Sequence, residues 1–221
     1  MPERTIAIGD IHGYDVPLEA LLARLSPTAD DTVVILGDVV DRGPNTRRCI
    51  ELLLQLREQC RLVFIMGNHE EMMLSAGNDP RVAESWLGFG GRDVVESYDG
   101  DLDNVPAEHW DFLRSGREHF ETDSDIFVHA AVLSDLPLDQ QPTDALRWMK
   151  TTGREPEHSS GKRVICGHTA QRSGIPRTWP GWVCIDTCVY CDSGRLTALD
   201  CTQNLLYQAD HDGNTYGPAD L

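Results

Sequence analysis

Aspartate and histidine residues follow several apolar segments of this chain, and both residue types can bind metal ions. The first case is the Gly-Asp-Ile-His-Gly sequence at residues 9–13, which follows the apolar run of residues 5–8. Two residues at this spacing leave a strand pointing the same way, so Asp10 and His12 can hold one ion. A lone Asp or His after a strand is usually a turn residue or a helix cap. The interpretation therefore depends on further ligands downstream.

Further candidate ligands follow four other apolar segments. The full set is Asp10, His12, Asp38, Asp41, Asn68, His69, His129 and His168. These side chains offer oxygen or imidazole nitrogen, which suits Mn²⁺, iron, Zn²⁺ or Mg²⁺. The set is larger than one tetrahedral ion needs, whereas two ions that share the Asp38 carboxylate would use it. The remaining histidines, at positions 109, 119, 158 and 211, lack this context and are interpreted as surface or structural residues.

The elements that must position these ligands alternate between strand and helix in the first half of the chain. Apolar runs predict strands, and apolar residues at helical spacing predict the helices between them; the strands are 4–8, 32–36 and 61–66 and the helices 16–25 and 47–58. Each predicted strand is followed by a polar, glycine-containing motif. Because sites in open α/β sheets form outside the carboxyl ends of strands, we expect the motifs to meet.

The pattern changes in the second half. Residues 71–115 are predicted to be helical with a break at Gly88–Gly91, and short strands are then expected at 125–129, 163–166, 182–185, 195–200 and 204–208. The segment after Asp210 is polar and predicted to be loose. No repeat or linker indicates a second domain, so one domain over residues 1–221 is expected.

Composition limits the class of protein. With 221 residues, 40% hydrophobic and 25% charged, the chain has a globular composition. No apolar run reaches the roughly 18 residues of a membrane helix, and the first residues do not resemble a signal peptide. We therefore expect a soluble, cytoplasmic protein without a membrane partner. The net charge of −17 argues against a nucleic-acid partner, because it would repel a polyanion.

The seven cysteines are expected to be mostly reduced thiols. Four of them are close in sequence: Cys184, Cys188, Cys191 and Cys201. A structural zinc site is one interpretation of this cluster, but the paired C-x2-C spacing is absent. Core thiols, or a redox-sensitive group at the rim of the site, are the preferred interpretation.

The motifs occur in an order that resembles a known family. They are GDIHG (9–13), GDVVDRG (37–43), GNHE (67–70), HAA (129–131) and GHT (167–169). Together they resemble the phosphoprotein phosphatase family of metallophosphoesterases, especially the small bacterial and phage serine/threonine protein phosphatases, although the family usually has HAG in place of HAA. The resemblance extends from Ile6 to about Leu206. It implies an α/β, calcineurin-like metallophosphoesterase fold with a central β-sandwich flanked by helices.

The resemblance also implies a role for each site residue. The first of two divalent ions, with Mn²⁺ preferred, would be held by Asp10, His12 and Asp38. The second would be held by Asp38, Asn68, His129 and His168. A metal-bridging water would attack the phosphorus directly.

The remaining roles concern the phosphate and the proton. Arg42 and Asn68 would bind the phosphate. His69 would be the general acid, oriented by Asp41. General acid catalysis is useful here because a serine or threonine alkoxide leaves poorly without a proton.

Two departures from the family pattern affect the site. Lys150 stands where the family has a second phosphate-binding arginine after a tryptophan, and lysine offers a point charge in place of a bidentate fork. We treat Lys150 as a phosphate ligand or, equally, as an ordinary surface lysine, with Arg147 and Arg154 as substitutes. Cys188 stands where the family commonly has glycine, so its oxidation could lower activity if it borders the pocket.

The principal hypothesis is a two-metal phosphomonoesterase that hydrolyses phosphoserine and phosphothreonine in proteins or peptides. The alternative is a dinucleoside polyphosphate hydrolase, for example of diadenosine tetraphosphate. It would need aromatic contacts for adenine, which could come from Trp86, Phe89, Trp148, Trp179 or Tyr190. A non-catalytic metal-binding protein is disfavoured, because metal binding alone would not require His69, Asp41 and Arg42. Arg92 could reach a substrate, although a neutral role is preferred.

Overall fold

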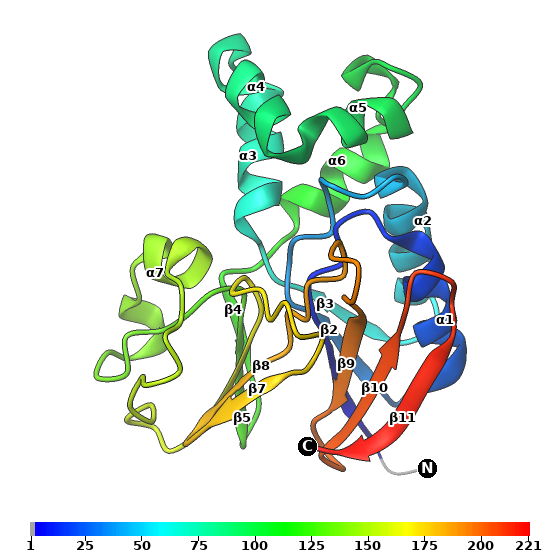
Figure 1. Cartoon of the computed structure of the whole chain (residues 1–221). Helices are drawn as coiled ribbons and strands as arrows, with labels where there is room; N and C mark the ends of the chain where they lie inside the picture. The colour runs from blue at the N-terminus through cyan, green and yellow to red at the C-terminus, as the bar shows by residue number, and fades with distance from the viewer. Residues whose placement is uncertain (1–2) are drawn as a thin grey trace.

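The computed structural model describes residues 3–221 and contains two β-sheets with helices around them (Figure 1). The first half alternates as predicted: β1 (Thr5–Ile8), α1 (Asp15–Leu25), β2 (Thr32–Ile35), α2 (Thr46–Arg57) and β3 (Arg61–Phe64). Apart from Thr5 and the first half of β3, these strand residues are buried. Burial on both faces explains why the strands read as continuous apolar runs.

The first sheet has six strands in the order β11-β10-β9-β1-β2-β3. Its C-terminal strands are β9 (Leu196–Asp200), β10 (Leu205–Ala209) and β11 (Thr215–Asp220). The second sheet has five strands in the order β4-β5-β6-β8-β7. These are β4 (His119–Glu121), β5 (Asp125–Val128), β6 (Arg163–Cys166), β7 (Arg177–Trp179) and β8 (Trp182–Cys184).

The two sheets pack face to face, as the resemblance implied. Ala7 and Val34 from the first sheet share a buried cluster with Phe127 and Ile165 from the second. The strand residues on either side of Ala7, by contrast, pack against α1 and α2 on the outer face of the first sheet. The alternation of side chains along β1 thus places the sandwich interior on one face and the helices on the other.

The segment between β3 and β4 is largely helical. It contains α3 (Asn68–Ala76), α4 (Pro80–Trp86), a π-helical turn (Leu87–Gly91), α5 (Arg92–Ser97), a 3₁₀ turn (Leu102–Asn104) and α6 (Ala107–Arg114). The predicted break at residues 88–91 is confirmed, because Gly90 has non-helical backbone angles (φ 113°, ψ 0°) and the helical path kinks there. These helices lie together at the top of Figure 1, and buried side chains from them join the cluster that contains α1 and α2.

Several short elements were missed by the sequence analysis. They are β4, β7, a 3₁₀ turn (Leu138–Gln140) and α7 (Thr143–Trp148). Each has three to six residues, too few for a period in hydrophobicity to stand out. Among residues 3–221, no helix is long and apolar enough to cross a membrane.

The prediction that residues after Asp210 are loose was wrong. Residues 215–220 form β11, which pairs antiparallel with β10 at the edge of the first sheet. All six residues are exposed, so main-chain pairing with β10 places this strand in the sheet. The Tyr216 hydroxyl donates to Asp210 at 2.7 Å, and the Arg195 guanidinium lies 3.8 Å over the Tyr216 ring. Such a strand has no apolar pattern by which a sequence could reveal it.

Candidate two-metal active site

Parallel strands from both sheets bring the predicted ligands to one edge of the sandwich. β1, β2 and β3 are parallel in the first sheet, and β5, β6 and β8 are parallel in the second. The segments after β1, β2, β3, β5 and β6 carry all six predicted metal ligands, at positions 10, 12, 38, 68, 129 and 168. Backbone hydrogen bonds join neighbouring segments, including one from His12 to Asp38 at 2.8 Å and one from Gly167 to His129 at 2.8 Å.

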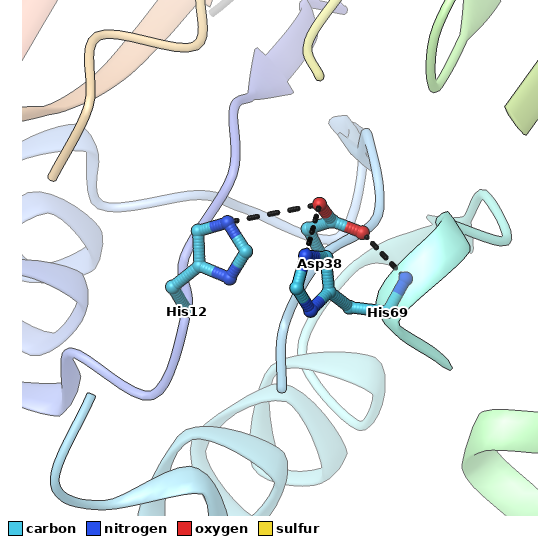
Figure 2. Close-up of side chains that lie close together, drawn as sticks. All are labelled: His12, Asp38 and His69. Carbon is cyan, nitrogen blue, oxygen red and sulfur yellow. Dashed lines mark hydrogen bonds and ion pairs between the residues drawn. The ribbon is translucent and has the colours of Figure 1, made fainter. Parts of the chain in front are cut away.

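The ligand atoms form two groups that share the Asp38 carboxylate. In each group they lie within 4.8 Å of one another, and the groups are His12, Asp38 and His69, and Asp38, His129 and His168. Figure 2 shows the first group, with the His12 and His69 rings close to the carboxylate of Asp38. A shared carboxylate between two donor groups is the arrangement that two metal ions with one bridging ligand require.

Hydrogen bonds to backbone carbonyls fix which nitrogen of each histidine carries the lone pair that could bind a metal. In three histidines one ring nitrogen donates to a backbone carbonyl: His12 to Val40 at 3.0 Å, His129 to Leu36 at 2.8 Å and His168 to Trp148 at 3.0 Å. The other nitrogen of each ring therefore carries a lone pair. Those of His12 and His129 lie 3.6 and 3.4 Å from oxygens of Asp38. Lone pairs that face a carboxylate repel it unless a cation lies between them, so this donor set fits metal ions.

The electrostatics of the site favour the ligating forms of these side chains. Burial lowers the pKa of His12 and His129, and it lowers the pKa of His168 to about 4, so all three rings are neutral at pH 7. Burial alone would raise the pKa of Asp38, but its histidine neighbours lower it well below the usual value. Asn68 completes the second group, since its Oδ1 lies 2.9 Å from His129 and 3.0 Å from His168.

Asp10 lies in the same site but belongs to neither donor group. Its carboxylate accepts the backbone N–H of His168 at 3.1 and 3.2 Å. Burial, together with the charges of Asp186 and Asp38, raises the pKa of Asp10 well above its usual value. Three buried carboxylates without a compensating cation are costly, which is a second sign that this site takes metal ions. The pairing of Asp10 with His12 on one ion stays a prediction.

Five predicted site residues have a positive φ, which residues with a Cβ rarely adopt. The φ values are 47° for His12, 49° for Asp38, 72° for Asp41, 70° for Arg42 and 61° for His168. Each such conformation costs of order 1–3 kcal/mol and persists only where the surroundings enforce it. The concentration of these angles at the strand ends marks the region as a built site.

Glu70 and Asp186 belong to the site but were not assigned a role from the sequence. The Glu70 carboxylate accepts four backbone N–H groups, from Asp38 at 2.8 Å, Val39 at 2.7 Å, Val40 at 3.2 Å and Gly67 at 3.0 Å. It thereby fixes the backbone segment that carries Asp38, the shared ligand. Asp186 is the second such residue, and burial raises its pKa to about 6. Glu70 lies inside a quoted motif, so its position was a usable signal.

The predicted proton donor and its partner are in contact. His69 Nδ1 lies 2.5 Å from Asp41 Oδ2, and both side chains are buried. Burial alone would lower the pKa of His69, but the carboxylates of Asp38 and Asp41 raise it above its usual value. The ring therefore favours the protonated form, which can donate but cannot coordinate a metal, although His69 is close enough to Asp38 to be counted in the first donor group.

A cavity of about 680 Å³ opens over the metal ligands. Three cationic side chains line it, namely Arg42, Lys150 and Arg172, and so do three aromatic ones, namely Phe89, Trp148 and Tyr190. The Arg42 guanidinium lies 4.5 Å over the Tyr190 ring and 2.5 Å from His12 Nε2. Arg172 was missed by the sequence analysis, because its position on a loop after β6 carries no motif.

Other predicted contributors lie elsewhere. Trp86 was a candidate adenine contact, but its ring is buried and donates to Asp41. Trp179 stacks on Trp182 outside the cavity lining. Arg147 pairs with Glu71 and Glu118. Arg154 and Arg92 are also absent from the residues that line the cavity. Three of the four histidines without a motif, at positions 109, 158 and 211, have structural contacts, for example the bond of 2.7 Å between His109 and the Tyr98 hydroxyl.

Five of the seven cysteines are free buried thiols, as expected, but two members of the cluster are not. Cys188 and Cys191 form a disulfide, whereas Cys184 and Cys201 are separate buried thiols. The zinc interpretation is therefore wrong for the arrangement seen here. The reason is local: the two residues lie three positions apart in a turn, so their Cα atoms are 5.4 Å apart. The disulfide brackets Tyr190, which contacts His12 and Arg42.

Comparison with known proteins agrees with the geometry of the site. The family model of the calcineurin-like phosphoesterases matches residues 3–175. The chain belongs to the calcineurin-like phosphoesterase family. This confirms the metallophosphoesterase resemblance and the sandwich fold that it implied.

Individual relatives add detail. A symmetrical bis(5'-nucleosyl)-tetraphosphatase of Pseudomonas fluorescens strain SBW25 is 33% identical over 131 residues, which cover 58% of this chain and 43% of that protein. The chain thus spans less than half the length of the curated relatives it matches.

Solved structures are similar in fold. A protein described as a candidate diadenosine tetraphosphatase superposes with a TM-score of 0.72, with 21% identity and 95% of each chain covered. The cold-active protein tyrosine phosphatase of a Shewanella species gives a TM-score of 0.68 at 18% identity, covering 99% of this chain and 81% of that one. At such identities the likeness is one of fold.

Proposed function

We propose that the chain hydrolyses dinucleoside polyphosphates such as diadenosine tetraphosphate in a reaction that requires two divalent metal ions. The observation that carries this proposal is the cavity of about 680 Å³, in which metal ligands, three cationic side chains and three aromatic side chains meet. A cavity of this size is typical of sites for small molecules. The alternative function from the sequence analysis thereby becomes the preferred one.

The cationic side chains support a substrate with several phosphates. Arg42, Lys150 and Arg172 line one cavity in a chain whose net charge is −17. A single phosphoryl group bound to two metal ions, Arg42 and the second cation of the family pattern would not need a third cationic side chain. A tetraphosphate chain carries more negative charge and extends further, so the additional cation has a function.

The aromatic side chains support a substrate with bases. Phe89 is 58% exposed and Trp148 is 42% exposed, although both line the cavity. Exposed aromatic faces beside a phosphate site can stack on nucleobases, which favours the substrate by about 1–3 kcal/mol per base. The named activity of the Pseudomonas fluorescens relative agrees with this interpretation.

The first metal ion would be held by Asp10, His12 and Asp38, and the second by Asp38, Asn68, His129 and His168, which leaves His69 free to donate a proton. When bound, such ions activate water and stabilise charge on phosphoryl oxygens. The ligand set of histidine, aspartate and asparagine fits Mn²⁺, iron, Zn²⁺ or Mg²⁺. The preference for Mn²⁺, the cytoplasmic location and the single domain stay predictions.

The contacts of His69 indicate how the proton is transferred during hydrolysis. Water adds to phosphorus, and the bond from phosphorus to the oxygen of the leaving nucleotide breaks. His69, whose protonated form Asp41 stabilises, gives its proton to that oxygen. Arg42 binds phosphoryl oxygens through its planar guanidinium. Cleavage between the two central phosphates of diadenosine tetraphosphate would give two molecules of ADP.

Hydrolysis of phosphoserine and phosphothreonine is the second candidate, and one observation favours it. The buried contact of 2.5 Å between His69 and Asp41 suits a general acid that protonates a strongly basic leaving group. An alkoxide needs this proton more than a nucleoside diphosphate does, because a phosphate oxygen is a weaker base.

The experiment compares diadenosine tetraphosphate with a phosphothreonine peptide, using metal-stripped protein to which Mn²⁺ is added. We expect higher kcat/KM for the dinucleotide and ADP as the only nucleotide product. Phe89→Ala and Trp148→Ala should raise KM for the dinucleotide by about 5- to 100-fold and leave the peptide unaffected. Tyr216→Ala, an exposed aromatic on β11, is the matched control. Faster hydrolysis of the peptide would contradict the proposal and restore the second candidate.

A further inference from the structure

Trp86 lies beside the proposed proton donor. Its side chain is 1% exposed, and its indole Nε1–H donates to both carboxylate oxygens of Asp41, at 3.0 and 3.1 Å. One of these oxygens, Oδ2, lies 2.5 Å from Nδ1 of His69. A continuous set of contacts therefore runs from the end of α4 through Asp41 to the ring that faces the metal ligands.

The carboxylate of Asp41 depends on this indole. Asp41 is completely buried, and among residues 3–221 its side chain accepts hydrogen bonds from His69 and Trp86. Oδ1 has the indole as its donor, so losing the N–H would leave a buried carboxylate oxygen without a partner. The indole N–H is also neutral. It therefore holds the carboxylate in place through both oxygens without adding a charge beside it.

The turn that follows Trp86 fixes the backbone of the same segment. Asp41 and Arg42 are consecutive residues with φ of 72° and 70°, an uncommon pair of angles for residues with a Cβ. The backbone N–H of Arg42 donates to the carbonyl of Gly90 at 3.2 Å. Gly90 has φ of 113°, and a Cβ at this position would lie 2.7 Å from the Arg42 nitrogen. Glycine thus allows the turn to approach closely enough to brace Asp41 and Arg42.

We propose that Trp86 is a positioning residue for proton donation: it orients Asp41 and, through Asp41, the ring of His69. The inference rests on the general-acid role proposed for His69 and is independent of whether the substrate is a dinucleotide. Without the indole N–H, the carboxylate can turn away from the orientation that aligns His69. The resulting loss of rate then depends on how much the leaving group needs a proton, which a purely structural role of Trp86 would not produce.

The test is Trp86→Phe, which keeps an aromatic ring and removes the N–H. Two phosphate monoesters are compared with Mn²⁺ present: phenyl phosphate, whose leaving group is the stronger base, and p-nitrophenyl phosphate. We expect kcat to fall by roughly 10- to 100-fold on phenyl phosphate and by less than about threefold on p-nitrophenyl phosphate. His69→Asn should show the same selectivity. The double variant should be no slower than His69→Asn alone, because both changes act on one step.

A matched control is available in Trp182. Its side chain is also 1% exposed, and its indole N–H donates to the carbonyl of Pro156 at 2.9 Å, outside the cavity lining. Trp182→Phe should reduce stability while leaving the ratio of the two rates unchanged. If Trp86→Phe does not fold, 3-benzothienylalanine at position 86 keeps the bicyclic shape and lacks the N–H. Metal content should equal that of the wild type, since the indole N–H donates to Asp41, which is not a predicted metal ligand.

The outcomes separate this inference from the proposed function. An equal loss on both esters for Trp86→Phe, or a loss of bound metal, would overturn the positioning role even if His69→Asn stays selective. A His69→Asn variant without selectivity would refute the general acid, and the role of Trp86 would fall with it. A wild type that hydrolyses both esters but not diadenosine tetraphosphate would refute the proposed substrate alone.

Discussion

Gly67→Ala tests whether the shared ligand needs the close approach of a glycine. Gly67 immediately precedes α3, and a Cβ at this position would meet the carboxylate oxygen Oδ1 of Asp38 first. It would also lie 2.5 Å from the backbone nitrogen of Asp38 and 2.7 Å from Oε2 of Glu70. Its φ of −90° and ψ of 170° are angles that alanine adopts freely, so the expected effect is steric alone.

The magnitude follows from the size of the clash. Ordinary contacts of a Cβ begin at 3.4 Å, so the Asp38 segment would have to move by about 0.9 Å, the difference from 2.5 Å. Overpacking of this kind costs about 1–3 kcal/mol in the free energy of unfolding. Because Asp38 belongs to both donor groups, the affinity for each metal ion should fall by roughly 10- to 100-fold. With metal present in excess, each tenfold loss removes a further ~1.4 kcal/mol.

The assay combines calorimetric titration with Mn²⁺ and urea denaturation with and without the metal. Gly88→Ala is the matched control, because no atom lies within 4 Å of a Cβ added there. The control should stay within about 0.5 kcal/mol of the wild type. If Gly67→Ala bound two Mn²⁺ ions with wild-type affinity, Asp38 would not be the ligand that the two sites share.

Three further changes test other parts of the structure. Asp38→Asn should abolish binding of both Mn²⁺ ions and reduce hydrolysis by at least roughly 100-fold, checked by metal analysis and rate. Asp31→Asn leaves the buried Arg4, now 2.6 Å from the carboxylate, unpaired, and should cost about 3–5 kcal/mol at pH 7. The side-chain hydrogen bond from Arg4 lowers the pKa of Asp31, so the ion pair stabilises the fold fully above about pH 4 and less at lower pH. The difference in unfolding free energy between wild type and variant should therefore be smaller at about pH 3 than at about pH 7, as measured by denaturation. Reduction of the disulfide between residues 188 and 191 frees Tyr190, and we expect KM to rise roughly two- to fivefold.

The elements that the sequence predicted well are those buried on both faces. Residues 32–35 form a continuous apolar run, and the structure buries all four of them as β2. The period in hydrophobicity of α2 is equally clear, since its buried residues recur along one face. β11 shows the opposite case, because all its residues are exposed and its main-chain pairing with β10 places it in the sheet. Local sequence carries no record of such pairing.

At the site, the sequence predicted the reactive residues well, but it did not predict the residues that position them. The predicted metal ligands could be found because each follows an apolar strand within a short motif. Trp86 and Arg172 could not be assigned in this way, because neither lies in such a motif. The indole of Trp86 reaches Asp41 across 45 positions, and nothing near either residue in sequence indicates the contact.

In the proposed site, chemistry and substrate choice come from different parts of the fold. The strand ends position the predicted metal ligands and the proposed proton donor, and the same groups suit an ester or an anhydride of phosphate. The principal hypothesis from the sequence rested on these motifs, so it could not distinguish a phosphoprotein from a dinucleotide. The aromatic side chains that could do so lie outside the motifs, with Trp148 on α7 and Phe89 on the turn at residues 87–91. That turn also accepts the backbone N–H of Arg42. A base stacked on Phe89 would therefore contact the turn that holds the backbone of Arg42, the predicted phosphate ligand. A phosphopeptide without a base would not make this contact.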